Sequence, residues 1–305
     1  MMNNMLLSKS HIIFQLGLWS FVGLLCSATS IAEDVSVTKA MISSTYSVDT
    51  LPGESLHHLL VPPKTRKRKQ ARIRRYRGVK YYTYSVDPNT TDIALYYDDE
   101  RRQRYQTIDN LNTELKAASK ELLFATNGGI FHVDGSPLGL YIEDGRQRKA
   151  VNLKRGYGNF YLHPNGIFYI NEWGFPNILE SLEFMNNFGE NPQHILYAIQ
   201  SGPLLLNKNR INRKLTPNSP NRKIRSGVGW SVTDPRSGMG KMVFVLSDSP
   251  VNFYDFAKFF QEELNCTRAL YLDGEISEMY LPELELNRTY NRFAVIIGVT
   301  NKTQK

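Results

Sequence analysis

The sequence predicts an α+β fold with a large mixed, mostly antiparallel β-sheet and about two main helices. Short runs rich in β-branched and aromatic residues recur from Gly78 to Val299, as expected of strands. Turn signals, such as Asp or Asn followed by Gly, separate several of these runs. Helical spacing of apolar residues is clear in only two stretches, after Thr107 and after Asn252. Strands therefore dominate, and long helices number about two.

The first 32 residues have the layout of a secretory signal peptide. Lys9 precedes an uncharged apolar run over residues 12–25, small residues follow, and cleavage is expected after Ala32. The run is short for a membrane span, and an uncleaved anchor is the alternative. We therefore expect an exported protein of the periplasm or cell envelope. After cleavage Cys266 is the only cysteine, so no intramolecular disulfide can form.

A basic tract separates the signal segment from the expected domain. We predict a flexible leader over residues 33–77 and a folded domain over residues 78–305. Residues 64–80 contain ten Lys or Arg and no acid, so the rest of the chain, whose total net charge is +8, carries −2. A solvated linker is the simpler interpretation, and a tether to an anionic envelope surface is the alternative. A nucleic-acid enzyme more often spreads its charge over a folded face, so no nucleic-acid partner is expected.

The first half of the domain shows short strands and one helix. Thr107 is a suitable cap for a helix with apolar residues at helical spacing from Ile108. The strand expected at residues 122–125 is followed by Gly128 and Gly129, where the backbone can turn sharply or approach a ligand. We expect the strands at residues 79–86 and 93–97 to pair as a hairpin, and those at residues 158–162 and 166–170 to pair as another. The expected strands are residues 79–86, 93–97, 122–125, 138–142, 158–162 and 166–170.

The second half repeats this pattern and contains the clearest helix. Asn252 can cap a helix that continues to about residue 264, with Phe256, Phe259 and Phe260 at helical spacing. Lys208-Asn209 indicates a hairpin turn. The run Ala269–Leu272 is typical of a buried strand. The expected strands are residues 195–200, 204–206, 227–232, 242–246, 269–272 and 293–299.

Polar residues gather at the ends of the predicted strands. The carboxylates of Asp273, Glu275 and Glu278 follow the buried run that ends at Leu272. A buried strand that delivers acids at its carboxyl end is a common way to build an active site. A tight Asp-Gly turn with solvated acids is the alternative. Other candidates at strand ends are Asn127, Gly128, Gly129, Ser201, Gly202, Pro203, Arg225 and Asp248.

Several familiar signatures are missing from the sequence. No Cys or His cluster has zinc spacing, and there is no P-loop, complete dinucleotide fingerprint or G-x-S-x-G motif. We therefore expect no resident metal, no cofactor and no nucleophilic serine. Carboxylates, an arginine and backbone amides suit a substrate that carries both a sugar and an anionic group.

These motifs occur in the order found in a known family. From about residue 78 to 299 the chain resembles the phosphodiester glycosidase domain family, and its exported bacterial branch most of all. That family includes the vertebrate uncovering enzyme, which removes N-acetylglucosamine from a phosphodiester on lysosomal glycoproteins. The matching pieces are Asn127-Gly-Gly-Ile-Phe131, Gln200-Ser-Gly-Pro203, Arg225-Ser-Gly-Val-Gly229, Val245-Leu-Ser-Asp248, the helix near 252–264 and Leu272-Asp-Gly274.

The chain departs from the family's usual pattern at two places. Glu275-Ile276 stands where the family usually has glycines, and only Ser277 matches the serines that follow them. Ser249-Pro250 follows Asp248 where the family usually has Gly-Arg. A glycine-rich backbone cradle is thus replaced by a charged side chain.

The resemblance implies a glycosidase that hydrolyses a sugar-1-phosphodiester in an envelope or polysaccharide glycan, releasing sugar and a phosphate monoester. Such cleavage passes through an oxocarbenium-like state and commonly uses two carboxyl groups. We assign the main role to Asp273, as nucleophile or as base for water, with Glu275 or Glu278 as the second acid. Arg225 is expected to pair with the phosphate. The remaining substrate-binding candidates are Asn127, Gly128, Gly129, Gly202, Asp248 and Ser277.

Two other functions stay open from the sequence. One is a non-catalytic envelope protein that binds acidic glycans through the same cleft, which the altered residues after Gly274 motivate. The other is binding of anionic lipid or nucleic acid through residues 64–80, for which the export signal makes nucleic acid the weakest candidate.

Overall fold

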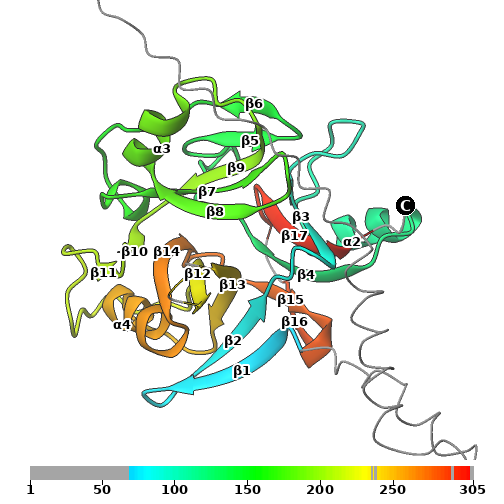
Figure 1. Cartoon of the computed structure of the whole chain (residues 1–305). Coiled ribbons are helices and arrows are strands. Elements are labelled where there is room, and N and C mark those ends of the chain that lie inside the picture. The colour runs from blue at the N-terminus through cyan, green and yellow to red at the C-terminus, as the bar shows by residue number, and fades with distance from the viewer. Residues whose placement is uncertain (1–68, 235, 237–238, 290–291, 303–305) are drawn as a thin grey trace, which may run out of the picture. The chain divides into compact units, whose positions relative to one another are not determined.

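The computed structural model describes residues 69–302, except 235, 237–238 and 290–291. The expected signal peptide and nearly all of the leader therefore lie outside the described residues. The described part of the chain contains three β-sheets, in which every strand pairing is antiparallel, together with the helices α2, α3 and α4 (Figure 1). This confirms the predicted α+β class, but the strands are divided among three sheets rather than joined in one.

The largest sheet has seven strands in the order β1-β2-β13-β12-β14-β10-β11. Its outer strand β1 pairs only with β2, and β12 lies between β13 and β14. Its strands are β1 (Ala71–Tyr76), β2 (Val79–Ser85), β10 (Leu204–Asn207), β11 (Arg210–Ile211), β12 (Ser226–Asp234), β13 (Met239–Ser247) and β14 (Cys266–Asp273).

The two other sheets have five strands each. One has the order β16-β15-β4-β17-β3 and the other the order β6-β5-β9-β7-β8. The first consists of β3 (Thr91–Tyr96), β4 (Leu122–Asn127), β15 (Met279–Leu281), β16 (Leu286–Arg288) and β17 (Ile296–Asn301). The second consists of β5 (Tyr141–Glu143), β6 (Arg146–Lys149), β7 (Gly166–Asn171), β8 (Pro176–Glu180) and β9 (Ile195–Ser201).

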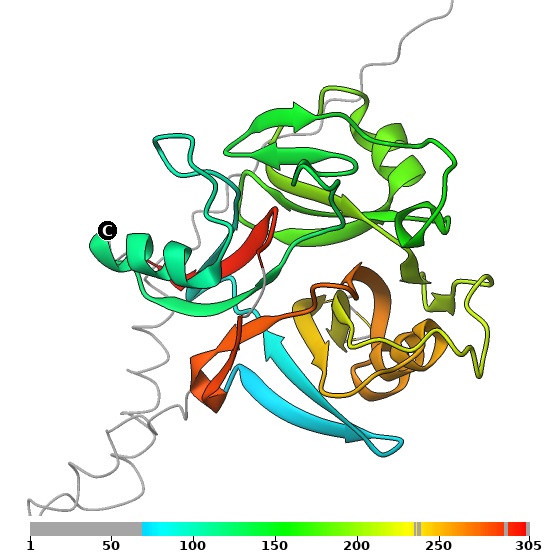
Figure 2. The same cartoon turned by 180° about the vertical axis from the view of Figure 1, so that it is seen from behind.

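Each sheet packs one helix against its outer face. Helix α4 (Phe253–Lys258), which continues as a π-helical turn over Phe259–Glu263, packs on the seven-stranded sheet. Helix α2 (Ile108–Ala117) covers β4 and β17, as Figure 2 shows from behind. Helix α3 (Ser181–Phe188) covers the sheet of β7 and β9. Short 3₁₀ turns occur at Asn159–Tyr161 and Pro282–Leu284.

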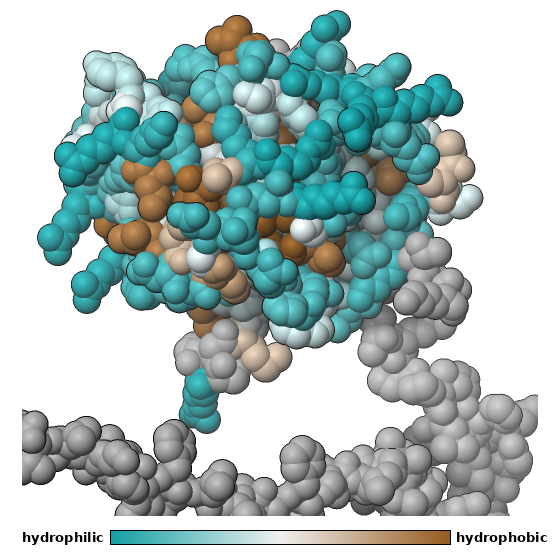
Figure 3. All heavy atoms as spheres, turned by 90° about the horizontal axis from the view of Figure 1, so that it is seen from above, coloured by the Kyte–Doolittle hydropathy of each residue, from teal (hydrophilic) through white to brown (hydrophobic). Residues whose placement is uncertain are grey.

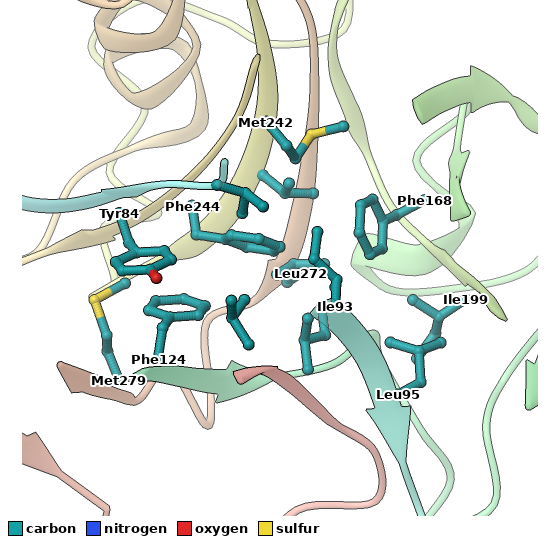
Figure 4. Close-up of a cluster of buried hydrophobic side chains, with 14 of the residues drawn as sticks. Tyr84, Ile93, Leu95, Phe124, Phe168, Ile199, Met242, Phe244, Leu272 and Met279 are labelled. Carbon is teal, nitrogen blue, oxygen red and sulfur yellow. The ribbon is translucent and has the colours of Figure 1, made fainter. Parts of the chain in front are cut away.

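The inner faces of all three sheets meet in one apolar core. Figure 4 shows Phe124, Phe168 and Phe244, one from each sheet, side by side in this core. Side chains alternate along a strand, so β13 points Phe244 inward and Val243 and Val245 outward against α4. Because both faces of the central strands are buried, these strands read as continuous apolar runs, as the sequence indicated.

Capping residues set the starts of the two predicted helices. The Thr107 side chain accepts a hydrogen bond from the Asn110 N–H at 3.2 Å, and the Asn252 side chain accepts one from the Asp255 N–H at 2.8 Å. Both predicted caps are confirmed. Helix α3, whose eight residues follow β8 directly, was not predicted from the sequence.

Three predictions about the strands were wrong. β2 and β3 do not form a hairpin, because β2 pairs with β1 and β13 whereas β3 pairs with β17. Residues 158–162 contain a 3₁₀ turn, so the expected hairpin with β7 does not form. The folded part also begins before Gly78, since β1 lies in the stretch expected to belong to the flexible leader.

The surface seen in Figure 3 is mostly hydrophilic, with small hydrophobic patches between the polar residues. Among the described residues, no helix combines the length and the apolarity that a membrane crossing requires.

Loss of the shared core should destabilise the whole domain. Phe244 is fully buried between Phe124 and Phe168, so Phe244→Ala should lower the free energy of unfolding by about 3–5 kcal/mol in urea denaturation. Ile73→Ala is the matched control, because 51% of Ile73 is exposed and its change should stay within about 0.5 kcal/mol. Equal losses in the two variants would contradict this view of the core.

Candidate active site

The candidate site lies at one end of the seven-stranded sheet. Ser226, the first residue of β12, is opposite Leu246 on one side and Asp273 on the other. Neighbouring strands are about 4.8 Å apart, so the ends of β13 and β14 lie close together here. The segment after β4 reaches the same place, because Ser201 Oγ donates to Leu272 O at 2.9 Å and accepts from the Ile130 N–H at 3.4 Å.

Asp273 is a nearly buried carboxylate at the end of β14, with 8% of the residue exposed. Its Oδ1 accepts hydrogen bonds from the backbone N–H groups of Gly274 at 2.5 Å and Glu275 at 2.9 Å. Burial raises the pKa of Asp273 above its ordinary value, although these amide hydrogen bonds act in the opposite direction. The site thus holds a carboxylate with a raised pKa and a fixed orientation.

The turn that carries Asp273 is closed by serine hydroxyls. Ser277 Oγ donates to the Asp273 carbonyl at 2.5 Å and accepts from the Ser226 N–H at 3.0 Å. The backbone N–H of Asp273 and the Ser226 hydroxyl also lie 3.3 Å apart at hydrogen-bonding geometry. The predicted substrate-binding residue Ser277 therefore fastens the turn to β12, and its substrate role stays a prediction.

Arg225 is fully buried beneath this turn. Its guanidinium lies 3.6 Å above the centre of the Phe253 ring and donates to Val251 O at 2.8 Å and Asn221 O at 2.9 Å. Burial lowers its pKa, against the opposing influence of Tyr271. The guanidinium does not face solvent in this conformation, so the expected contact with a substrate phosphate is not supported by its position.

Gly274 packs directly on the buried polar ends of two side chains. A Cβ added there would lie 2.1 Å from the Tyr271 hydroxyl and 3.3 Å from Arg225 Nη1. Both polar atoms are buried, and the Tyr271 hydroxyl interacts with the Arg225 guanidinium. A side chain at position 274 has no room, so the turn requires glycine after Asp273.

Asn127 fastens a second buried carboxylate to the end of β4. Its Oδ1 accepts from the Glu278 N–H at 3.2 Å, and the neighbouring Thr126 hydroxyl donates to the Glu278 carbonyl at 2.7 Å. Its Nδ2 donates to Gly128 O at 3.1 Å. Since the Asn127 amide is used within the protein, it positions the backbone of Glu278, whose residue is buried.

The other predicted glycines allow close packing between segments. A Cβ at Gly129 would lie 2.6 Å from Gln200 O, and one at Gly128 would lie 2.9 Å from Val295 O. A Cβ at Gly202 would lie 2.7 Å from Phe160 O. These contacts bring the ends of β4 and β9 together. Whether their amides also orient a substrate stays a prediction.

The remaining predicted acids are held by cations. Asp248 pairs with Lys80 at 3.1 Å and Arg288 at 2.5 Å. Partial burial acts to raise its pKa, but the hydrogen bonds from both cations outweigh it and leave the pKa of Asp248 below its ordinary value. The Glu275 side chain is 74% exposed and pairs with Lys223 at 3.2 Å, so it points away from a buried site.

The structure brings most of the predicted residues to one region but gives several of them structural partners. Asp273, Ser277 and Arg225 contact β12 or its flank, and Asn127 contacts Glu278. The positions of Lys80, Ser226, Tyr271 and Arg288 in this region were not predicted from the sequence. Only Ser226 had a local signal, its place after Arg225 in a matching motif, whereas the two cations meet Asp248 from distant segments.

Comparison with known proteins identifies the family. A model of the family described as "Phosphodiester glycosidase" matches residues 120–299. The chain belongs to the phosphodiester glycosidase family. It is 36% identical over 219 residues, covering 72% of this chain and 81% of the relative, to the protein of Escherichia coli strain K12 described as "Uncharacterized protein YigE".

Two solved structures are similar to the chain at low sequence identity. The catalytic domain of zebrafish N-acetylglucosamine-1-phosphodiester alpha-N-acetylglucosaminidase, auto-inhibited by its pro-peptide, is 16% identical with a TM-score of 0.47, covering 75% of this chain and 81% of that one. A hypothetical protein from Synechocystis is 16% identical with a TM-score of 0.50, covering 76% of this chain and 61% of that one.

The two aspartates should change stability with pH in opposite directions. The raised pKa of Asp273 means that its contribution to stability is present at low pH and is lost as pH rises through that pKa. Relative to wild type, Asp273→Asn should therefore gain stability as pH increases. The lowered pKa of Asp248 contributes stability above the ordinary carboxyl pKa of about 3.9, which is lost as pH falls.

Thermal unfolding of wild type and both variants, at neutral pH and at low pH, measures this difference. Asp248→Asn should lower Tm at neutral pH by about 2–4 °C, which corresponds to about 1 kcal/mol, and converge with wild type at low pH. If both variants changed with pH in the same direction relative to wild type, the electrostatic assignments would be wrong.

Proposed function

We propose that the protein is an exported phosphodiester glycosidase that hydrolyses a sugar-1-phosphodiester in a glycan of the cell envelope. Membership of the phosphodiester glycosidase family supports glycosidase chemistry on a phosphodiester-linked sugar. The buried, amide-oriented carboxylate of Asp273 is the observation on which the mechanism rests. The glycan, its location and the export of the protein are parts of this proposal.

In the proposed reaction the bond between the anomeric carbon and the phosphate oxygen breaks. Asp273 attacks the anomeric carbon itself, or removes a proton from the water that attacks it. The phosphate monoester leaves with the bonding electrons, and water supplies the hydroxyl of the released sugar. A phosphate monoester has a second pKa of about 6, so it leaves with little help from an acid. The raised pKa of Asp273 brings its basicity closer to neutral pH.

Glu278 is the better candidate for a second carboxyl group. It is buried, and its backbone is fixed by Asn127 and Thr126 at the end of β4. Glu275, the other acid considered, is exposed and paired with Lys223. A carboxyl group held away from water responds more strongly to charge developing on the sugar than one on the surface.

Lys80 and Arg288 are better placed than Arg225 to meet the phosphate. Both cations are partly exposed at the end of the sheet where β13 delivers Asp248. Asp248 holds them together, and Tyr82 lies beneath both, with Lys80 Nζ 5.1 Å and Arg288 Cζ 5.6 Å from its ring centre. A phosphate that binds Lys80 and Arg288 would replace the Asp248 carboxylate as their anionic partner.

Removal of the Asp273 charge should abolish turnover. With the purified mature protein and a sugar-1-phosphodiester, Asp273→Asn should lower kcat by at least about 100-fold, because the nucleophile or base is lost. A plain aryl glycoside is the control substrate and should be a poor substrate for both proteins. Sugar release by the variant at the wild-type rate, with folding intact, would exclude this role for Asp273.

The two glutamates should differ in their effect on catalysis. Glu278→Gln keeps the shape of a buried side chain and should lower kcat by at least about 100-fold, because the carboxylate that stabilises charge developing on the sugar is lost. Glu275→Gln is the matched control, and its exposed position predicts a change of no more than a few-fold. Comparable rates in the two variants, measured on the same diester, would remove Glu278 from the mechanism.

Binding of acidic glycans without turnover is the second candidate function. The observation that favours it is that the Asn127 amide, the Ser277 hydroxyl and the Arg225 guanidinium all bond within the protein. Saturable glycan binding with no sugar released from a broad panel of phosphodiesters would support this function over hydrolysis.

The basic tract at residues 64–80 supports a second, anionic partner in the envelope. Its described part includes β1, whose Arg72 and Arg75 are exposed. An anionic surface would therefore meet cations on a strand of the folded domain as well as those that precede it.

A further inference from the structure

A basic groove runs along β10 and β11. Two hollows of about 560 and 500 Å³ share His163 and Pro164 in their walls. One wall of this basic groove is Asn207–Lys214, which comprises the β10–β11 turn, β11 and the loop that follows it, at the left of Figure 1. The second hollow is lined by the segment before β7, by Glu180 at the end of β8 and by Leu182 of α3.

The charges along the basic groove are strongly unbalanced. Its lining contains Lys208, Arg210, Arg213 and Lys214, against a single acid, Glu180. Lys208 is partly compensated by Glu183 at 3.4 Å. Arg210, Arg213 and Lys214 are exposed and form no ion pair with any other residue that the structure describes. Three uncompensated cations around one hollow favour an anionic ligand.

The backbone that carries these cations is held in place. Asn212 is buried, and its N–H donates to Leu205 O at 3.0 Å while its Nδ2 donates to Leu204 O at 3.1 Å. Its Oδ1 accepts the Lys214 N–H at 3.0 Å, and Leu215 is buried directly afterwards. Arg213 and Lys214 therefore start from a fixed backbone, which reduces the entropy lost when a ligand binds.

The second hollow offers a different surface next to the cations. It is lined by Leu153 and Leu182, both of which are exposed apolar residues, and by the buried Asn165. Apolar side chains can cover the C–H faces of a sugar ring while the cations meet its anionic groups. The groove thus suits a molecule that contains both sugars and phosphates.

The far end of the basic groove, at the β10–β11 turn, is too distant from Asp273 for a small diester to reach both. The near end is closer, because the Pro164 carbonyl accepts the Leu204 N–H at 2.8 Å and the Tyr271 N–H donates to Pro203 O at 3.2 Å. The β10–β11 turn is tied to the start of β14, where the Asn209 N–H donates to Thr267 O at 2.7 Å. Asp273 follows Thr267 by six positions in β14, which corresponds to about 20 Å. A ligand that extends from Asp273 to the β10–β11 turn must therefore contain several sugar-phosphate units.

We propose that the basic groove binds one segment of a polymeric, phosphodiester-linked glycan while Asp273 acts on another. The substrate class is then an anionic polymer rather than a free sugar diester. This inference rests on the proposed function for the reaction at Asp273, whereas binding in the groove is independent of turnover.

The test compares two triple variants with the same change in charge. Arg210→Gln, Arg213→Gln and Lys214→Gln together remove the uncompensated cations, and Arg101→Gln, Lys116→Gln and Lys120→Gln remove three other exposed cations as the control. The probe is a polysaccharide with phosphodiester-linked repeating units, with neutral dextran for comparison, titrated calorimetrically at low and high salt.

The groove variant should bind the phosphorylated polymer at least about tenfold more weakly, whereas the control should match wild type. Its KM for the polymer should rise, while kcat and KM for a small sugar-1-phosphodiester stay unchanged. Retained polymer binding by the groove variant, equal loss in the control, or tighter binding of duplex DNA than of the glycan would overturn the proposal. Polymer binding that is lost only in the groove variant, without turnover of any diester, would support the groove and refute the proposed hydrolysis.

Discussion

The shared apolar core is the constraint on which the rest of the structure depends. Three sheets turn their inner faces toward one another, and a helix covers the outer face of each. The central strands are therefore buried on both sides, where a polar side chain would lose its hydration. Polar groups therefore collect mainly where strands end. This is the physical reason why the candidate site forms at the ends of β4, β13 and β14.

At these strand ends the protein satisfies buried polar groups by connecting distant segments. The amide of Asn127 holds the backbone of Glu278, and the hydroxyl of Ser201 connects Ile130 with Leu272. In each connection, a buried polar group that has lost its contact with water forms a hydrogen bond within the protein instead. The same bonds fix the backbone around Asp273, so the network that stabilises the chain also orients the carboxylate.

The features that sequence analysis predicted correctly depend on local patterns. Continuous apolar runs identified the buried strands, and Thr107 and Asn252 marked the helix starts because capping involves residues only a few positions away. The placement of Asp273 at a strand end follows from the same kind of pattern.

The features that it missed depend on contacts between distant segments. Residues 79–86 and 93–97 have the local pattern of a hairpin, yet their partners β13 and β17 lie far along the chain. Arginine is rarely buried, so nothing local indicated that Arg225 would be stacked on Phe253. Likewise, the pairing of Asp248 with Lys80 and Arg288 appears only after three strands assemble.

The outer strand β1 has a consequence for association between copies of the chain. An edge strand exposes unpaired backbone groups that can add a strand from another molecule. Here that edge carries Arg72, Arg74 and Arg75, and two such edges would repel each other on approach. The charges of these arginines therefore disfavour strand pairing between two copies of the chain. Because ions screen this repulsion, its effect weakens in concentrated salt.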